Sequence, residues 1–125
     1  MLSVESIINN WDYIHFVLYL SICTAEADYV IKEDEKNIIR TRMKSIGVQG
    51  LNFEALYNEV HTTFKMLKDI QSIELIKGLG KKYCSDDETR DSILKFMNEI
   101  VDSDKSRLQT ERIILREIKW LLDNY

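Results

Sequence analysis

The sequence predicts an all-α protein, a single compact bundle of six or seven helices with an internal helix–acidic turn–helix repeat. Proline is absent and glycine occurs only four times in 125 residues, so helices can run uninterrupted and tight β-turns are poorly supplied. Apolar residues recur three to four positions apart over most of the chain, which is typical of helices that bury one face. Two acidic segments with the same spacing each separate two such apolar runs.

Composition limits the class of protein. At 125 residues the chain predicts one domain, residues 1–125, large enough for a stable core. A net charge of −4 argues against nucleic acid as the main ligand, because such proteins usually carry a clustered basic face. Cys23 and Cys84 lie in apolar stretches without metal or redox spacing, which is typical of reduced thiols. No apolar stretch is long enough for a membrane span and no basic leader is present, so the expected location is the cytoplasm.

The first two expected helices cover roughly residues 4–26 and 33–46. In the first, one face is apolar along its whole length: Ile7, Trp11, Ile14, Leu18, Ile22 and Ala25. The second begins with three acids and ends with three bases, an order that complements the helix dipole. Gly47 is the expected stop of this helix, and Gly50 extends the break.

Polar residues mark the starts of four more expected helices. Asn52 is the expected N-cap of the third, and Asp69 that of the fourth. Ser85 and Ser106 begin S-x-x-E and S-x-x-Q patterns, which are capping boxes for the fifth and sixth. The expected core stripes of the third, fourth and fifth helices are Phe53, Leu56, Tyr57, Val60, Phe64 and Leu67; Ile73, Ile76 and Leu79; and Ile93, Leu94, Met97, Ile100 and Val101. The C-terminal run Trp120, Leu121 and Leu122 is expected to dock into the core.

The two acidic segments are the candidate binding site. In each, two acids at i, i+2 close an apolar run and a glutamate follows seven positions after the second acid. Carboxylate oxygens are the ligands that Ca²⁺ and Mg²⁺ prefer. Asp28 and Glu35 can share one ion only if the chain folds back between them, because they would be about 10 Å apart along one continuous helix. The candidate metal ligands are Asp28, Glu35, Asp104 and Glu111, with Glu26 and Asp102 as accessory acids.

Two other interpretations of the acidic segments were weighed. An EF-hand is excluded, because loop positions 6 and 12 of the second segment would be Arg107 and Ile113, where the motif needs glycine and a bidentate acid. Helix capping stays open, because acids at helix ends often bond N–H groups and complement the dipole without binding any ligand.

The acidic segments resemble those of the TerB-like (tellurite-resistance) domain family. The resemblance lies in residues 23–35 and, more loosely, in residues 100–111. It implies a compact bundle of about seven helices in which the two motifs approach each other on one surface. It also implies a bacterial, cytosolic stress-response protein with a divalent-metal site and protein partners, and no established catalytic activity. Tyr29 and Lys105 stand where the family commonly has glycine after the motif aspartate.

None of the remaining sequence motifs indicates an enzyme. The run Lys77–Lys82 contains two glycines but lacks P-loop spacing, and is expected to be a frayed, solvated helix end. His15 and His61 have no metal-ligand or nucleophile partner at sequence spacing, so each is expected to be a packed or surface side chain. A catalytic pairing of Cys84 with His61 or of Cys23 with His15 stays possible but lacks a third, orienting group.

We therefore expect a non-enzymatic module that binds a divalent cation and a protein partner. The alternative is a metal-free adaptor with an acidic docking face.

Overall fold

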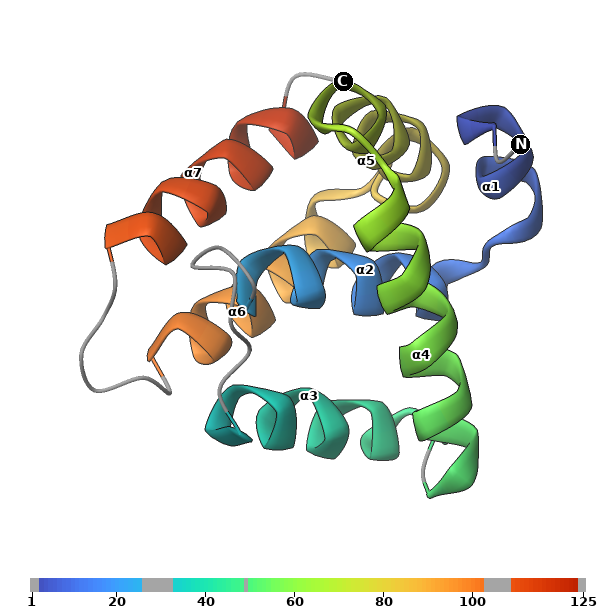
Figure 1. The fold of residues 1–125 in the computed structure, drawn as a ribbon. Coiled ribbons are helices and arrows are strands. Elements are labelled where there is room, and N and C mark those ends of the chain that lie inside the picture. The colour runs from blue at the N-terminus through green and yellow to red at the C-terminus, as the bar shows by residue number, and fades with distance from the viewer. Residues whose placement is uncertain (1–2, 26–32, 49, 103–108, 124–125) are drawn as a thin grey trace.

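The structure is a computed structural model that describes residues 3–25, 33–48, 50–102 and 109–123, with only the backbone described at 34–35, 101–102 and 109–115. Seven helices make up this part of the chain (Figure 1), which confirms the all-α bundle. Their bounds are α1 Val4–Asn10, α2 Tyr13–Ala25, α3 Glu33–Ser45, α4 Leu51–Met66, α5 Asp69–Tyr83, α6 Asp87–Asp102 and α7 Gln109–Asp123. None of the helices in the described ranges is long and apolar enough to cross a membrane.

Helix α2 is the centre of the bundle. It lies against α3, α4, α5, α6 and α7, and in Figure 1 it crosses the middle of the molecule. Its residues 16–22 are all buried, whatever side of the helix they occupy. Two buried residues of α2 carry hydroxyls: Ser21 donates to the carbonyl of Val17 at 2.7 Å, and Thr24 donates to that of Leu20 at 2.9 Å. Hydroxyls can thus be buried here without an unsatisfied donor.

The first expected helix is two helices in the structure. Helix α1 ends at Asn10 and Trp11 is extended, with φ −84° and ψ 144°. Asp12 then acts as the N-cap of α2, because its Oδ1 accepts the backbone N–H of His15 at 3.1 Å. The apolar period continues across the break, since Ile7, Trp11 and Leu18 are all buried. The apolar periodicity of the sequence therefore gave no indication that the helix is interrupted.

The turn between α3 and α4 follows the expected glycines. Gly47 has φ +95°, and its N–H bonds the carbonyl of Lys44 at 3.1 Å while Val48 bonds that of Met43 at 2.9 Å. This arrangement satisfies two carbonyls at the end of α3 in the manner of a Schellman motif. Gly50, with φ +62°, precedes α4 as its N-cap.

Three expected helix starts are displaced by one or two residues. Asn52 lies inside the first turn of α4 and Gly50 takes the cap position. Asp69 is the first residue of α5, and Lys68 is its N-cap. For α6 the capping side chain is Asp86 rather than Ser85, since Asp86 Oδ2 accepts the Thr89 N–H at 3.1 Å. Ser106 lies outside the described residues, and α7 is described from Gln109.

Among the described residues most of the expected core is buried or half-buried, and two of its members are exposed. Ile73 is 43% exposed and its neighbour Leu75 is fully buried instead, so the buried face of α5 is rotated from the expected stripe. At the C-terminal end Leu121 and Leu122 are buried as expected, but Trp120 is 59% exposed. The buried apolar side chains of all seven helices form one continuous core.

Helix α5 also corrects the expected frayed end at Lys77–Lys82. The helix continues to Tyr83, and Leu79 and Gly80 are buried. Helix α1 packs on α5 here, and a Cβ added to Gly78 would overlap Ile8 Cδ1. Glycine at position 78 therefore permits the close approach of α1 and does not mark a loose helix end.

Candidate functional site

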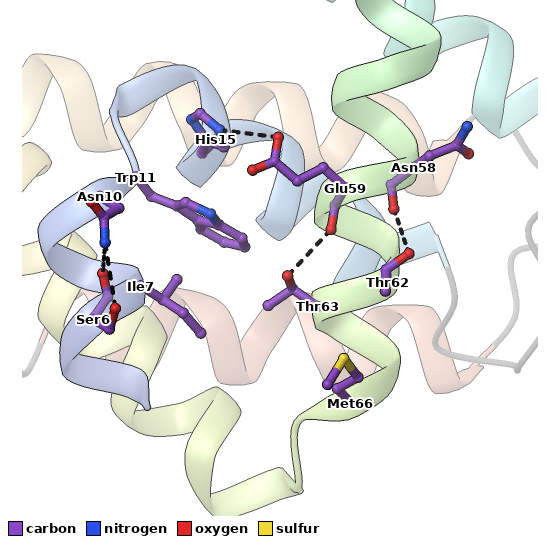
Figure 2. Close-up of a pocket in the computed structure, with 10 residues that line it drawn as sticks. All are labelled: Ser6, Ile7, Asn10, Trp11, His15, Asn58, Glu59, Thr62, Thr63 and Met66. Carbon is purple, nitrogen blue, oxygen red and sulfur yellow. Dashed lines mark hydrogen bonds and ion pairs between the residues drawn. The ribbon is translucent and has the colours of Figure 1, made fainter. Parts of the chain in front are cut away.

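The described surface has an open cleft of about 550 Å³ between α1 and α4, shown in Figure 2. Helix α1 packs on α5, whereas α4 packs on α2, and the cleft lies where α1 and α4 face each other. Buried Trp11 and Ile7 lie deep in it. The volume is in the range of sites for small ligands. Its lining residues are Ser6, Ile7, Asn10, Trp11, His15, Asn58, Glu59, Thr62, Thr63 and Met66.

The break between α1 and α2 brings the side chains of this cleft together. It directs Trp11 into the space between the helices and puts Asp12 and His15 at the start of α2. The last turn of α5 holds the break through main-chain contacts. Lys82 Nζ donates to the carbonyl of Ile8 at 3.2 Å, and the Tyr83 hydroxyl donates to the carbonyl of Trp11 at 3.0 Å. Carbonyls left without partners at the end of α1 are thereby satisfied.

His15 connects two carboxylates across the cleft. Its Nδ1 lies 2.8 Å from Asp12 Oδ1, and its Nε2 lies 3.8 Å from Glu59 Oε2. The imidazole stacks on the Trp11 ring, with centroids 5.5 Å apart and planes 21° apart. A carboxylate can only accept, so a hydrogen bond between these two atoms needs a proton on Nδ1.

The charge of Asp12 is stabilised at this position. Partial burial raises the pKa of Asp12, but the hydrogen bonds and the charge interaction that it makes with His15 outweigh this effect, so the pKa lies below its ordinary value. The side chains of Asp12 and Glu59 remain 63% and 58% exposed. Glu59 lines the cleft, and its carboxylate is therefore accessible to a ligand there.

The α4 side of the cleft offers mainly hydrogen-bond acceptors. Thr62 donates its hydroxyl to the carbonyl of Asn58 at 2.7 Å, and Thr63 donates to that of Glu59 at 3.2 Å. Each hydroxyl has one proton, so its remaining capacity is to accept. On α1, Asn10 uses its amide N–H on the carbonyl of Ser6 at 2.8 Å. Of the described residues, none that lines this cleft is lysine or arginine.

The six predicted metal ligands cannot be placed relative to one another. Glu26, Asp28 and Asp104 lie outside the described residues, and the side chains of Glu35, Asp102 and Glu111 lie outside them as well. Within the described part of the chain, no three His, Cys, Asp or Glu side chains come together as a metal site would require. The metal site stays a prediction from the sequence.

The remaining singled-out residues are packed. His61 lies between aromatic rings of α4, 5.6 Å from the Tyr57 ring centroid and stacked 6.3 Å from that of Phe64. Cys23 is half-buried, Cys84 is buried, and neither forms a disulfide. Burial, followed by the charge of Asp86, raises the pKa of the Cys84 thiol to about 11. Such a thiol is a poor nucleophile at neutral pH.

Sequence reasoning missed the cleft because its members come from separate segments. The contact between Asp12 and His15 could have been predicted, because Asp12 precedes His15 by three positions, the spacing at which an N-cap carboxylate meets the N3 residue. Nothing in the sequence connects His15 with Glu59, which lies on α4. Comparison of the chain with protein-family models, curated proteins and solved structures finds no significant match.

Proposed function

We propose that this chain is a non-enzymatic module that binds a divalent cation, Ca²⁺ or Mg²⁺, through its two acidic segments and associates with protein partners. The TerB-like resemblance adds a role in bacterial stress response in the cytoplasm. The ligands would be Asp28, Glu35, Asp104 and Glu111, assisted by Glu26 and Asp102. The observation that carries the proposal is the arrangement of the four helices that flank the acidic segments.

These four helices pack reciprocally. Helix α2 lies against α6, while α3 packs on α6 and α7 packs on α2. Near the ends of the central pair, the Thr24 hydroxyl donates to Met97 Sδ at 3.4 Å. In Figure 1, α2 and α6 end, and α3 and α7 begin, on the same side of the molecule. This supports an approach of the two acidic segments, which connect those ends.

The ends of α2 and α6 supply partial negative charge on this side of the molecule. Neither α2 nor α6 has a basic residue in its last turn, and the C-terminal end of a helix carries partial negative charge. Two nearby bases on α3 are directed to α4 instead. Lys36 lies 3.8 Å and Arg40 lies 3.2 Å from the carboxylate of Glu54.

Thermal unfolding of chelator-treated protein, with and without millimolar Ca²⁺ or Mg²⁺, tests the proposal. A ligand at one hundred times its dissociation constant stabilises the native state by about 2.7 kcal/mol. We expect this shift in midpoint to disappear in the double variant Asp28→Asn, Asp104→Asn. The matched control is Glu74→Gln, Glu117→Gln, which removes the same charge from exposed positions and should keep the shift. If neither ion raises the midpoint, the metal proposal is wrong.

A metal-free adaptor is the second candidate, and exposed Trp120 favours it. Tryptophan is a preferred anchor at protein interfaces, and Trp120 is 59% exposed on α7. Partner binding would then be indifferent to chelator and, because the chain is acidic, weaker at high salt. Affinity capture with and without chelator distinguishes the two: loss of partner in chelator supports the metal-dependent module, and chelator-independent, salt-sensitive capture supports the adaptor.

A further inference from the structure

The indole N–H of Trp11 is a buried donor on the wall of the α1–α4 cleft. Trp11 is 6% exposed and lines the cleft. Its main chain is fully used, since its N–H donates to the carbonyl of Ile7 at 2.8 Å and its carbonyl accepts from the Tyr83 hydroxyl at 3.0 Å. Among the described residues, no atom accepts a hydrogen bond from its indole nitrogen. A buried donor without an acceptor lowers stability, so this group needs an explanation beyond the fold.

Most other donors of the lining are already used. The ring nitrogens of His15 face the carboxylates of Asp12 and Glu59, at 2.8 and 3.8 Å. Thr62 and Thr63 donate their hydroxyl protons to carbonyls of α4. Three further lining residues that carry donors are exposed to water: Ser6, Asn10 and Asn58. The Trp11 indole is thus the buried donor that a ligand meets in this cleft.

Glu59 supplies an acceptor on the other side of the same space. Its Oε2 faces His15, whereas its Oε1 makes no hydrogen bond or ion pair with another described residue. Figure 2 shows this second oxygen on the side of the carboxylate that is turned toward the Trp11 ring. A ligand held between the two residues must therefore accept a proton from Trp11 and donate one to Glu59.

We propose that the cleft binds a small molecule that carries a neutral carboxamide on an apolar ring. The carbonyl oxygen of the amide accepts the Trp11 indole N–H, and its nitrogen donates to Glu59 Oε1. An amide has both groups on one carbon. A carboxylate ligand has no proton to donate and is repelled by Glu59, and an alkylammonium has no acceptor for Trp11. A neutral amide satisfies both groups of the protein.

The rest of the lining suits the apolar ring. Buried Ile7 lies next to Trp11, on the side away from Glu59 in Figure 2. Met66, 61% exposed, continues this apolar surface, and methionine makes favourable contacts with aromatic rings. The cleft of about 550 Å³ is in the range of small-molecule sites. A ring covers more of this surface than the thin stem of a glutamine side chain on a partner protein, which favours a small molecule.

The experiment is a titration with benzamide followed by NMR of the two indole N–H groups. We expect the Trp11 resonance to shift downfield and saturate, with a dissociation constant on the order of 1 mM, as ligands of this size allow. The resonance of Trp120, which is exposed on α7, should stay unchanged. Benzoate and benzylamine are the matched probes, and each should bind about tenfold more weakly. No saturable shift of Trp11, or equal affinity for benzamide and benzoate, would overturn the proposal.

Variants assign the binding to the two residues. Glu59→Gln keeps an acceptor oxygen and removes the charge, so the preference for benzamide over benzoate should fall about threefold. Glu74→Gln, at an exposed position outside the cleft, should leave this preference unchanged. Equal effects of the two variants would mean that Glu59 does not select the amide. Trp11→Phe keeps a ring and removes the N–H, and a folded Trp11→Phe protein that binds benzamide as tightly as the original chain would contradict the site.

The final arms separate this site from a partner protein and from the proposed metal function. Nα-acetyl-glutamine methylamide presents the same amide on a side chain, and tighter binding of this probe than of benzamide would show that the occupant is not a small molecule. All titrations are run in chelator and repeated with the Asp28→Asn, Asp104→Asn protein, for which we expect the same benzamide affinity. Loss of binding there would contradict a cleft that works on its own.

Discussion

The α1–α4 cleft and the contact between α2 and α6 are held by different forces. The cleft depends on exposed polar contacts: His15 between two carboxylates, and Lys82 and Tyr83 on the carbonyls of the α1–α2 break. The α2–α6 contact depends on buried volume, since Ile22, Ala25, Met97 and Ile100 are all fully buried. Surface polar contacts contribute little to stability and much to shape, whereas buried volume does the opposite. The cleft should therefore tolerate substitutions that the α2–α6 contact does not.

The largest expected effect comes from Met97→Ala, compared with the same substitution at Met66. Met97 is fully buried between α6 and α2, and Met66 is 61% exposed beside the cleft. Removing a buried methionine side chain leaves a cavity and costs about 2–5 kcal/mol of unfolding free energy. Met66→Ala should change it by no more than about 0.5 kcal/mol. Urea denaturation measures both, and equal losses would break the comparison.

An intermediate effect is expected from Tyr83→Phe. The variant removes the hydroxyl that bonds the Trp11 carbonyl at 3.0 Å, and a lost hydrogen bond of this kind costs about 1 kcal/mol. Tyr13→Phe is the control, because the described contacts of half-buried Tyr13 include a ring contact with Tyr83 but no hydroxyl bond. Thermal denaturation should show the larger loss for Tyr83→Phe. A larger loss for Tyr13→Phe would mean that α5 does not hold the break through this bond.

The smallest effect is a change in acid sensitivity at Asp12. Its pKa in the folded protein is below the ordinary value, so its contribution to stability is complete above about pH 4 and is lost as the pH falls through the folded pKa. Asp12→Asn retains a good N-cap residue and removes only the charge. The variant should lose less stability than the original chain between about pH 5 and pH 2. Parallel pH profiles from chemical denaturation would show that His15 does not stabilise the Asp12 charge.

Local chemistry made the helices predictable, and contacts between distant segments made the cleft unpredictable. Absence of proline, apolar periodicity and the Gly47 stop identified a helical bundle, and the buried stripe of α4 appeared at Phe53 and Val60 as expected. The break at Trp11 was missed because the apolar period continues through it. The role of Gly78 was misinterpreted because the side chain that packs against it, Ile8, belongs to a helix far away in the sequence. The predicted acidic ligands stay a sequence prediction, since their side chains lie outside the described residues.

The close approach of Ile8 to Gly78 has an evolutionary consequence. A side chain at position 78 overlaps Ile8, so natural variants should change the two positions together: a larger residue at 78 with a smaller one at 8. Alanine at position 78 would gain helix propensity of about 1 kcal/mol, but it would require the end of the Ile8 side chain to move aside. Covariation of positions 8 and 78 among relatives would thus record how tightly α1 has been held against α5 over time.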